Sequence, residues 1–160
     1  ESSDDIEDGE ETQLVVFHLG QQEFGISIEA VQEITRVPQE MNVVPKTADF
    51  VEGMVNLRGA VLPVMDMRSR FGMEKMGRSD RQRILVLDLK GSSTGFITDA
   101  VAEVLRLSKR LIEDAPNLSE EQAKVMGRVV NLKEQNRMIQ VLDASQLLAQ
   151  NELQVLSKAG

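Results

Sequence analysis

The chain carries an internal repeat, and this repeat limits the folds that it can adopt. Residues 14–37, LVVFHLGQQEFGISIEAVQEITRV, align without a gap on residues 84–107, ILVLDLKGSSTGFITDAVAEVLRL, at an offset of 70. A later segment recurs less cleanly, since VNLRG at 55–59 resembles VNLKE at 130–134. Such a repeat indicates one supersecondary unit built twice, so we expect two related lobes. The identical pairs of the ungapped alignment are Val16/Val86, Leu19/Leu89, Gly25/Gly95, Ala30/Ala100, Val31/Val101, Glu33/Glu103 and Arg36/Arg106.

Each repeat begins with an apolar, β-rich run that reaches a polar turn and continues into a second run, the pattern of a β-hairpin. The turns are Gly20-Gln21-Gln22 in the first repeat and Lys90-Gly91-Ser92-Ser93 in the second. The segments that follow, AVQEITRV at 30–37 and AVAEVLRL at 100–107, have mixed periodicity. We interpret each of them as a short helical turn that enters a strand.

A second hairpin and a short closing helix complete each repeat. The last strands of these hairpins contain VMD at 64–66 and VLD at 141–143. Their final residues, Asp66 and Asp143, are of a type that caps helix N-termini, and Gly72 is of a type that ends a helix. A further helix is expected from Ser119, in the longer connection of the second repeat.

Five short strands and a terminal helix, occurring twice, predict a mainly β fold of two small barrels packed together. Closing each sheet into a barrel hides the sheet edges. A unit of about 70 residues is marginally stable alone, so the two lobes should share an interface. We place lobe one at about 20–65 and lobe two at about 75–142, with terminal strands and helices exchanged between them.

The negative charge of the chain is concentrated at its start. The net charge is −8, yet residues 1–11, ESSDDIEDGEE, hold seven acids and no base, whereas the rest of the chain holds 18 basic and 19 acidic side chains. Residues 1–12 therefore read as an acidic, disordered tail or linker. A nearly neutral body with no Tyr or Trp is a poor partner for nucleic acid, which excludes an oligonucleotide-binding barrel as the preferred interpretation.

The residues of catalysis and metal binding are missing or isolated. The chain has no Cys, and its single histidine, His18, has no acid, Ser or second ligand at a telling spacing. No constellation of nucleophile, base and orienting group is visible, so we predict no enzyme, no cofactor and no metal site. No apolar run reaches the roughly 18 residues of a membrane span, so no direct membrane insertion is expected.

Three fragments together resemble a CheW-like domain, the domain of chemotaxis coupling proteins. They are GISIEAVQEITRV, FVEGMVNLRGAVLPVMDMRSRFG and GFITDAVAEVLRL, and the similarity covers about residues 13–150, with 151–160 as the end of a helix and a tail. The resemblance implies two intertwined five-stranded SH3-like barrels that share a hydrophobic core. It also implies a cytoplasmic, non-catalytic adaptor at membrane-associated receptor arrays.

The resemblance implies two partners and a set of contact residues for each. The cytoplasmic tip of methyl-accepting chemoreceptors would lie in a groove between the lobes, and the regulatory domain of the histidine kinase CheA would pair with one lobe. The receptor groove would be lined by Ile28, Val31, Arg58, Gly95, Val101 and Val104. The kinase interface would include Glu33, Met41, Val43 and Val44.

Arg58 has two compatible interpretations. Glu33 and Arg58 in the first repeat match Glu103 and Lys133 in the second, which predicts an ion pair within each lobe that braces a hairpin against the preceding strand. Arg58 would also shape or touch the receptor groove.

An alternative function belongs to the same class of protein. The chain begins with Glu and an acidic segment, which is compatible with a docking domain of a larger multidomain protein that localises it to the array, and equally with a processed N-terminus.

Overall fold

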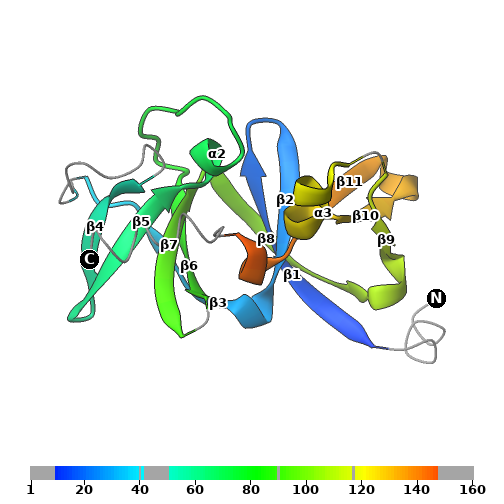
Figure 1. Ribbon diagram of the computed structural model, residues 1–160, viewed down its shortest axis with the longest axis horizontal. Coiled ribbons are helices and arrows are strands. Elements are labelled where there is room, and N and C mark those ends of the chain that lie inside the picture. The colour runs from blue at the N-terminus through cyan, green and yellow to red at the C-terminus, as the bar shows by residue number, and fades with distance from the viewer. Residues whose placement is uncertain (1–9, 40, 42–50, 90, 117, 148–160) are drawn as a thin grey trace. The chain divides into compact units, whose positions relative to one another are not determined.

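The computed structural model divides the chain into two compact units and describes residues 10–39, 41, 51–89, 91–116 and 118–147 (Figure 1). Unit one contains the described residues of 1–29 together with 102–147, and unit two contains those of 30–101. Within the described residues, the chain therefore passes from one unit to the other between Glu29 and Ala30 and again between Val101 and Ala102.

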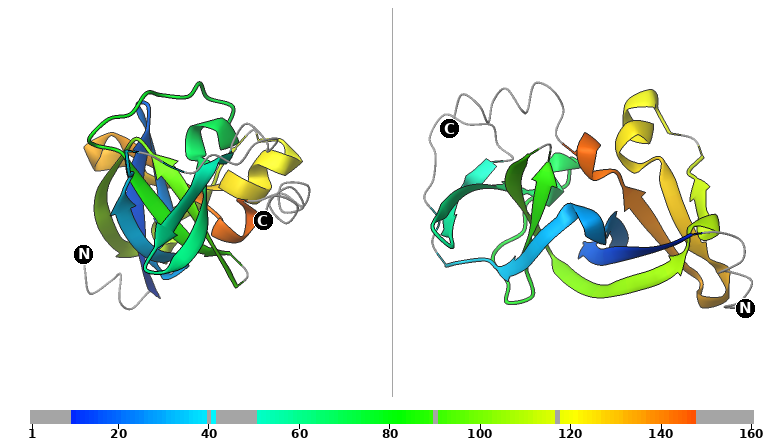
Figure 2. Two further views of the ribbon diagram at one scale, coloured as in Figure 1. Left: turned by 90° about the vertical axis from the view of Figure 1, so that its left-hand side faces the viewer. Right: turned by 90° about the horizontal axis from the view of Figure 1, so that it is seen from below.

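Unit one is built on a six-stranded sheet in the order β8-β1-β2-β11-β10-β9. The long edge strand β8 lies beside β1, as Figure 2 shows. The strands are β1 (Glu11–Leu19), β2 (Gln22–Ser27), β8 (Ala100–Ser108), β9 (Ile112–Asp114), β10 (Arg128–Leu132) and β11 (Arg137–Leu142). The helices are α3 (Glu120–Met126) and the short 3-10 turns η1 (Ile28–Ala30), η2 (Lys109–Leu111), η3 (Lys133–Gln135) and η4 (Ala144–Gln146).

Unit two is built on a five-stranded sheet in the order β3-β6-β7-β5-β4. Four neighbouring pairs hold it together, of which only β5 and β7 run parallel. Its elements are β3 (Val31–Arg36), β4 (Val51–Leu57), β5 (Ala60–Asp66), α2 (Met67–Arg70), β6 (Arg83–Leu89) and β7 (Ser92–Thr98).

The two sheets have the same strand order once the repeat is taken into account. Strands β1, β2 and β3 correspond to β6, β7 and β8, while β4 and β5 correspond to β10 and β11. Substituting these equivalents turns the order of one sheet into that of the other, with β9 as an extra strand in unit one. Each unit therefore combines the first hairpin of one repeat with the remaining strands of the other repeat.

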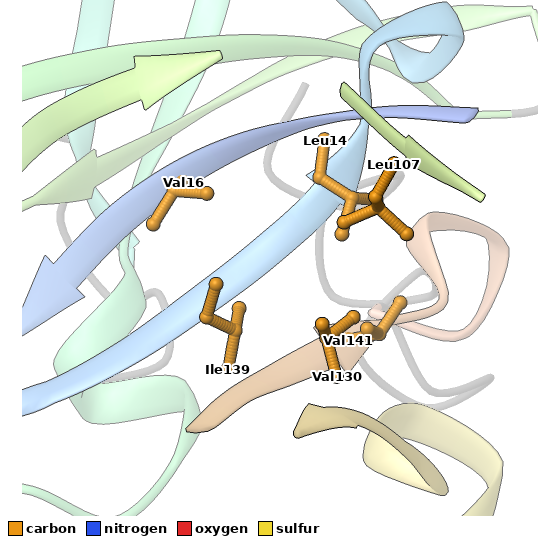
Figure 3. Close-up of a cluster of buried hydrophobic side chains, with 6 residues drawn as sticks. All are labelled: Leu14, Val16, Leu107, Val130, Ile139 and Val141. Carbon is orange, nitrogen blue, oxygen red and sulfur yellow. The ribbon is translucent and has the colours of Figure 1, made fainter. Parts of the chain in front are cut away.

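Each unit has its own apolar cluster, made by the inward face of its strands. In unit one, aliphatic side chains from β1, β8, β10 and β11 converge, as Figure 3 shows: Leu14, Val16, Leu107, Val130, Ile139 and Val141. In unit two the cluster contains Leu62, Val64, Ile84, Val86 and Ile97. Cluster residues of one strand recur at spacings of two because alternate side chains point to the same face. The opposite face of these strands is covered too, since Val15 on β1 and Leu85 on β6 are also buried.

Local sequence signals account for the turns and for helix α3. Gly20 and Gly91 have φ values of 63° and 85° at the tips of the first hairpins of the two repeats, a conformation that glycine adopts without steric cost. Helix α3 begins at a capping box, in which the Ser119 hydroxyl accepts from the backbone N–H of Gln122 and the Gln122 side chain accepts from that of Ser119. The helix predicted from Ser119 is confirmed.

The predicted helical turn before the third strand is confirmed in one repeat and wrong in the other. In the first repeat, η1 precedes β3. In the second repeat, β8 is one continuous strand from Ala100 to Ser108. Ala100 is buried there, so the start of β8 lies in the interior, whereas η1 has no buried residue.

A partly buried ion pair in unit two fixes helix α2 and was not foreseen from the sequence. Arg68 donates from Nε and from a terminal nitrogen to the two carboxylate oxygens of Asp99, at 2.9 and 2.6 Å. The other terminal nitrogen donates to the Glu74 carbonyl at 3.0 Å. The hydrogen bonds to Asp99 raise the pKa of Arg68. Such a fork-to-fork pair restrains both orientation and distance, so it ties α2 to the turn after β7.

Candidate interaction surfaces

Arg58 stands at the tip of the hairpin formed by β4 and β5, in a strained backbone conformation. Leu57 and Ala60 are the last paired residues, which leaves a two-residue turn. Arg58 and Gly59 have φ values of 55° and 85°, so both are left-handed, as in a type I′ turn. The Asn56 side chain accepts a hydrogen bond from the Gly59 N–H at 3.1 Å. A left-handed arginine costs about 1–2 kcal/mol relative to the right-handed region.

The Arg58 guanidinium reaches back to Glu33 on the edge strand β3. A terminal nitrogen of Arg58 lies 3.1 Å from a carboxylate oxygen of Glu33, and the two side chains are 79% and 24% exposed. Strand β3 and the β4–β5 hairpin belong to opposite edges of the five-stranded sheet, so this contact shows that the sheet curls back on itself. The predicted ion pair is confirmed, and its exposure limits its contribution to about 0–1 kcal/mol.

In unit one the equivalent glutamate, Glu103 on β8, pairs with a different cation from the predicted one. The partner is Arg137, the first residue of β11, and not Lys133. Lys133 begins η3, because the β10–β11 connection has two more residues than the β4–β5 turn. The cation that pairs with the glutamate therefore lies in the β4–β5 turn in unit two and at the start of β11 in unit one. Aligning VNLRG with VNLKE does not reveal this difference, because it ignores the length of the connection.

Arg137 is more enclosed than Arg58 and holds two carboxylates. Its Nε and one terminal nitrogen donate to Glu23 on the neighbouring strand β2, at 3.0 and 2.8 Å, and the terminal nitrogen also contacts Glu103. Its side chain is 21% exposed. The hydrogen bonds that Arg137 donates, to Glu23 first and to Glu103 second, raise the pKa of Arg137. The cation therefore fastens β8 to the hairpin of unit one as Arg58 fastens β3 to that of unit two.

Exposed apolar side chains occupy equivalent positions in the two units. On the edge strands, Ile34 of β3 is 39% exposed and Val104 of β8 is 48% exposed. On the hairpins, Val61 lies opposite Asn56 and is 68% exposed, while Met138 lies opposite Asn131 and is 55% exposed. Each unit thus presents one apolar residue on its edge strand and one on its hairpin. Of these four residues, only Val104 is among the contact residues predicted from the sequence, and Ile34, Val61 and Met138 are not.

The residues predicted for the receptor groove divide between the two units. In unit one, Ile28 lies in η1 and is 37% exposed, and the Val104 side chain on β8 is also exposed. In unit two, Val31 begins β3 opposite Leu87 and is half-buried. Val101 is half-buried on β8, and Arg58 is exposed at its hairpin tip.

Gly95 is buried in the sheet of unit two, where packing explains why the residue is glycine, and its assignment to the groove stays a prediction. It is paired with Val86 on β6 and Val64 on β5. A Cβ atom at this position would lie 2.7 Å from the Ile84 Cγ2 methyl, closer than carbon atoms approach. The equivalent Gly25 would meet Leu14 and Ile139 at 3.1 and 3.2 Å. Close packing therefore explains why glycine occupies this position of both repeats.

The residues predicted for the kinase interface are only partly described. Glu33 is the partner of Arg58 on β3. Met41 is half-buried and packs against the apolar cluster of unit two. Val43 and Val44 lie outside the described residues, and their assignment stays a prediction.

The described part of the chain shows no grouping of three or more His, Asp or Glu side chains that could hold a metal ion. His18 is half-buried on β1, opposite Glu23 in the strand register. Within the same residues, no helix combines the length and apolar character that crossing a bilayer requires.

Comparison with known proteins places these features in one family. The profile of the CheW-like domain matches residues 13–152. The "Chemotaxis protein CheW" of Rhizobium meliloti is 34% identical over 140 residues, which cover 88% of this chain and 89% of that protein. The "Probable chemotaxis protein CheW" of Rhizobium etli is 31% identical over the same shares. The crystal structure of the scaffolding protein TtCheW from Thermoanaerobacter tengcongensis superposes with a TM-score of 0.78 at 30% identity, over 89% of this chain and 96% of that one.

Proposed function

The chain belongs to the family of CheW-like domains and is a scaffold of chemotaxis signalling; from this premise we propose that it couples chemoreceptors to the histidine kinase CheA without catalysing a reaction. The receptor partner is the cytoplasmic tip of a methyl-accepting chemoreceptor, and the kinase partner is the regulatory domain of CheA. The protein would work in the cytoplasm, at receptor arrays to which its partners bring it.

Arg58 is the observation that carries this proposal. Its backbone is left-handed at a turn position where Asn or Gly is favoured, so arginine is not the residue that best stabilises the hairpin. Its ion pair with Glu33 contributes about 0–1 kcal/mol, which does not exceed the backbone cost. A strained residue with an exposed, five-donor side chain indicates a use at the surface.

Apolar residues supply the remaining contact area in the proposal. The proposed receptor contacts include Ile28 and Val104 in unit one, because both are exposed, and Val31 in unit two, because it lies on the edge strand β3. The proposed receptor contacts also include Val101. They do not include Gly95, which is buried in unit two. Burying one such side chain contributes about 1.5–3 kcal/mol, so a few of them suffice for a reversible complex. Glu33 and Met41, with Val43 and Val44, form the proposed kinase contacts.

The proposal is tested by amide NMR titration of the isotopically labelled protein with a chemoreceptor-tip hairpin, and separately with the CheA regulatory domain. We expect the receptor hairpin to shift the resonances of Ile28, Val31, Arg58 and Val104. The Arg58→Asn variant should bind the receptor hairpin about tenfold more weakly, as expected when an interface arginine is removed. Its stability should be equal or higher, because Asn tolerates the left-handed turn.

Arg81→Asn is the matched control, because Arg81 is an exposed arginine in a turn of the same unit. It should leave both titrations unchanged. The absence of shifts with either partner at millimolar concentration would reject the coupling function. Shifts with the kinase domain alone would remove the receptor contact and leave a docking role. Equal receptor affinity for Arg58→Asn and the unsubstituted protein would reduce Arg58 to a brace within its own hairpin.

A further inference from the structure

A cavity in unit one has a basic wall that the proposed function does not use. Its volume is about 550 Å³, and it lies where the start of β1, the end of β8 and the strands β10 and β11 meet. Three cations line it, namely Arg106 from β8, Lys109 from η2 and Arg128 from β10. Its apolar lining is formed by Leu14, Ile28, Ile112, Val141 and Leu142. A cationic wall over an apolar floor suits a peptide that carries carboxylates.

Two carboxylates of the chain's own acidic segment, Glu10 and Glu11, form ion pairs with two of the three cations. An oxygen of Glu11 lies 2.8 Å from Nε of Arg106 and 2.8 Å from a terminal nitrogen. An oxygen of Glu10 accepts from Nζ of Lys109 at 2.8 Å, and the Glu10 carbonyl accepts from the Lys109 backbone N–H at 2.9 Å. The acidic segment therefore binds through main chain and side chain together.

These contacts are exposed, which makes them exchangeable. The side chains of Arg106, Lys109 and Glu10 are 70%, 55% and 78% exposed. Ion pairs of this kind are weak and screened by salt, so a competing carboxylate can replace either of them. The hydrogen bond and charge of Glu10 raise the pKa of Lys109, Glu29 acts in the same direction, and Arg128 opposes it.

The charges balance only while the acidic segment is in place. The lining contains three cations and two carboxylates, Glu11 and Glu29, and Glu10 adds a third carboxylate from the rim. Without Glu10 and Glu11, the cavity would keep three cations against Glu29 alone. The site then has room for two added negative charges, the number that two neighbouring acidic residues supply. Asp114, which lies opposite Arg128 in the register of β9 and β10, does not line the cavity.

We propose that this cavity is a binding site for an acidic peptide, and that the chain's own acidic segment is its resident ligand, held through Glu10 and Glu11. Any partner that presents neighbouring carboxylates to this face must first displace the tethered pair. Glu10 and Glu11 belong to the same chain as the cavity, so they compete with any added carboxylate at a high effective concentration. The site depends on Arg106 and Lys109 and is independent of Arg58.

The test measures binding of a fluorescent peptide with the sequence of residues 1–11 by anisotropy at low ionic strength. The Glu10→Gln/Glu11→Gln variant should bind this peptide about tenfold more tightly than the unsubstituted protein, because the tethered competitor has been neutralised. Affinity should fall steeply as salt is added. Adding Arg106→Glu and Lys109→Glu to that variant should abolish binding.

A control variant separates the cavity from the general effect of charge. Glu120→Gln/Glu134→Gln removes the same two charges from exposed positions of unit one and should bind the peptide as the unsubstituted protein does. Equal affinity of the two double variants, or binding that survives the charge reversal, would overturn the proposal. Absence of peptide binding to the folded Glu10→Gln/Glu11→Gln variant would also overturn it, whatever the receptor titration shows. Circular dichroism checks that each variant is folded.

Discussion

At the scale of single residues, Gly95 and Arg58 are both unusual for the strand and the turn that contain them, and they are present for opposite reasons. Gly95 is required by the space around it, because a methyl group there would meet the Ile84 side chain at 2.7 Å. Arg58 is not required by its turn, where φ is 55° and smaller residues fit better. The first residue serves packing inside unit two, and the second presents a charge at its surface.

Gly95→Ala should lower the free energy of unfolding by about 1–3 kcal/mol, the range for overpacking a filled core. The contacted atom is a methyl group on the β-carbon of buried Ile84, which cannot swing away as the end of a long side chain can. Urea denaturation measures the effect. Gly25→Ala, whose nearest contacts are at 3.1 and 3.2 Å, should cost less. Adding Ile84→Leu removes the clashing methyl branch and should recover part of the stability that Gly95→Ala loses. If Gly95→Ala lowered the free energy of unfolding no more than Gly25→Ala, the packing explanation would be contradicted.

At the scale of elements, each unit fastens its edge strand to a hairpin by one arginine. The contact joins β3 to the β4–β5 turn in unit two and β8 to the start of β11 in unit one. The two cations differ in exposure, since the Arg58 side chain is 79% exposed and that of Arg137 is 21% exposed. Screening by water is therefore stronger for Arg58, and we expect unequal coupling energies.

Double-mutant cycles with Gln substitutions should give about 0–1 kcal/mol for Arg58 with Glu33, the range of exposed ion pairs. The coupling between Arg137 and Glu23 should be larger, because Arg137 donates more than one hydrogen bond to Glu23 and both side chains are at least three-quarters covered. Urea denaturation of the four proteins of each cycle provides the values. Equal coupling in the two units would show that exposure does not decide the strength of these braces.

At the scale of the whole molecule, the sequence repeat and the structural unit are different objects. The described residues of unit two all lie within 30–101, and the unit takes β3 to β5 from the first repeat and β6 and β7 from the second. Unit one is assembled from the two ends of the described chain. The lobes expected from the sequence, about 20–65 and 75–142 with terminal strands exchanged, follow the repeats more closely than the units do.

A fragment of residues 30–101 should unfold cooperatively in urea, since it contains all five strands of its sheet. A fragment of residues 14–83, which is one whole repeat, should not unfold cooperatively. In this fragment the hairpin β1–β2 has lost its neighbours β8 and β11, and β3 and β5 have lost their neighbours β6 and β7. The fragment of residues 30–101 should be only marginally stable, as expected of a folded unit of about 70 residues. Far-UV circular dichroism and the dispersion of amide resonances distinguish the two results, and the reverse outcome would show that the repeat is the folding unit.

The sequence alone determined the features that depend on neighbouring residues. Gly20 and Gly91 mark hairpin tips because left-handed backbone favours glycine, and Ser119 with Gln122 begins a helix because their side chains satisfy its free N–H groups. The repeat predicted an acid and a base held together, and Glu33 with Arg58 confirms it. The resemblance to CheW-like domains, read from the same residues, is confirmed by the family match.

Only the tertiary structure decided the features that depend on which distant segments pair. Hairpin β1–β2 joins the sheet of β10 and β11, over a hundred residues away, because strand pairing is set by long-range packing that local propensity does not encode. The cation of Glu103 proved to be Arg137 because loop length, not sequence similarity, places the side chain. Ile34, Val61 and Met138 proved exposed, because the alternation of side chains along a strand does not say which of its faces the fold will cover.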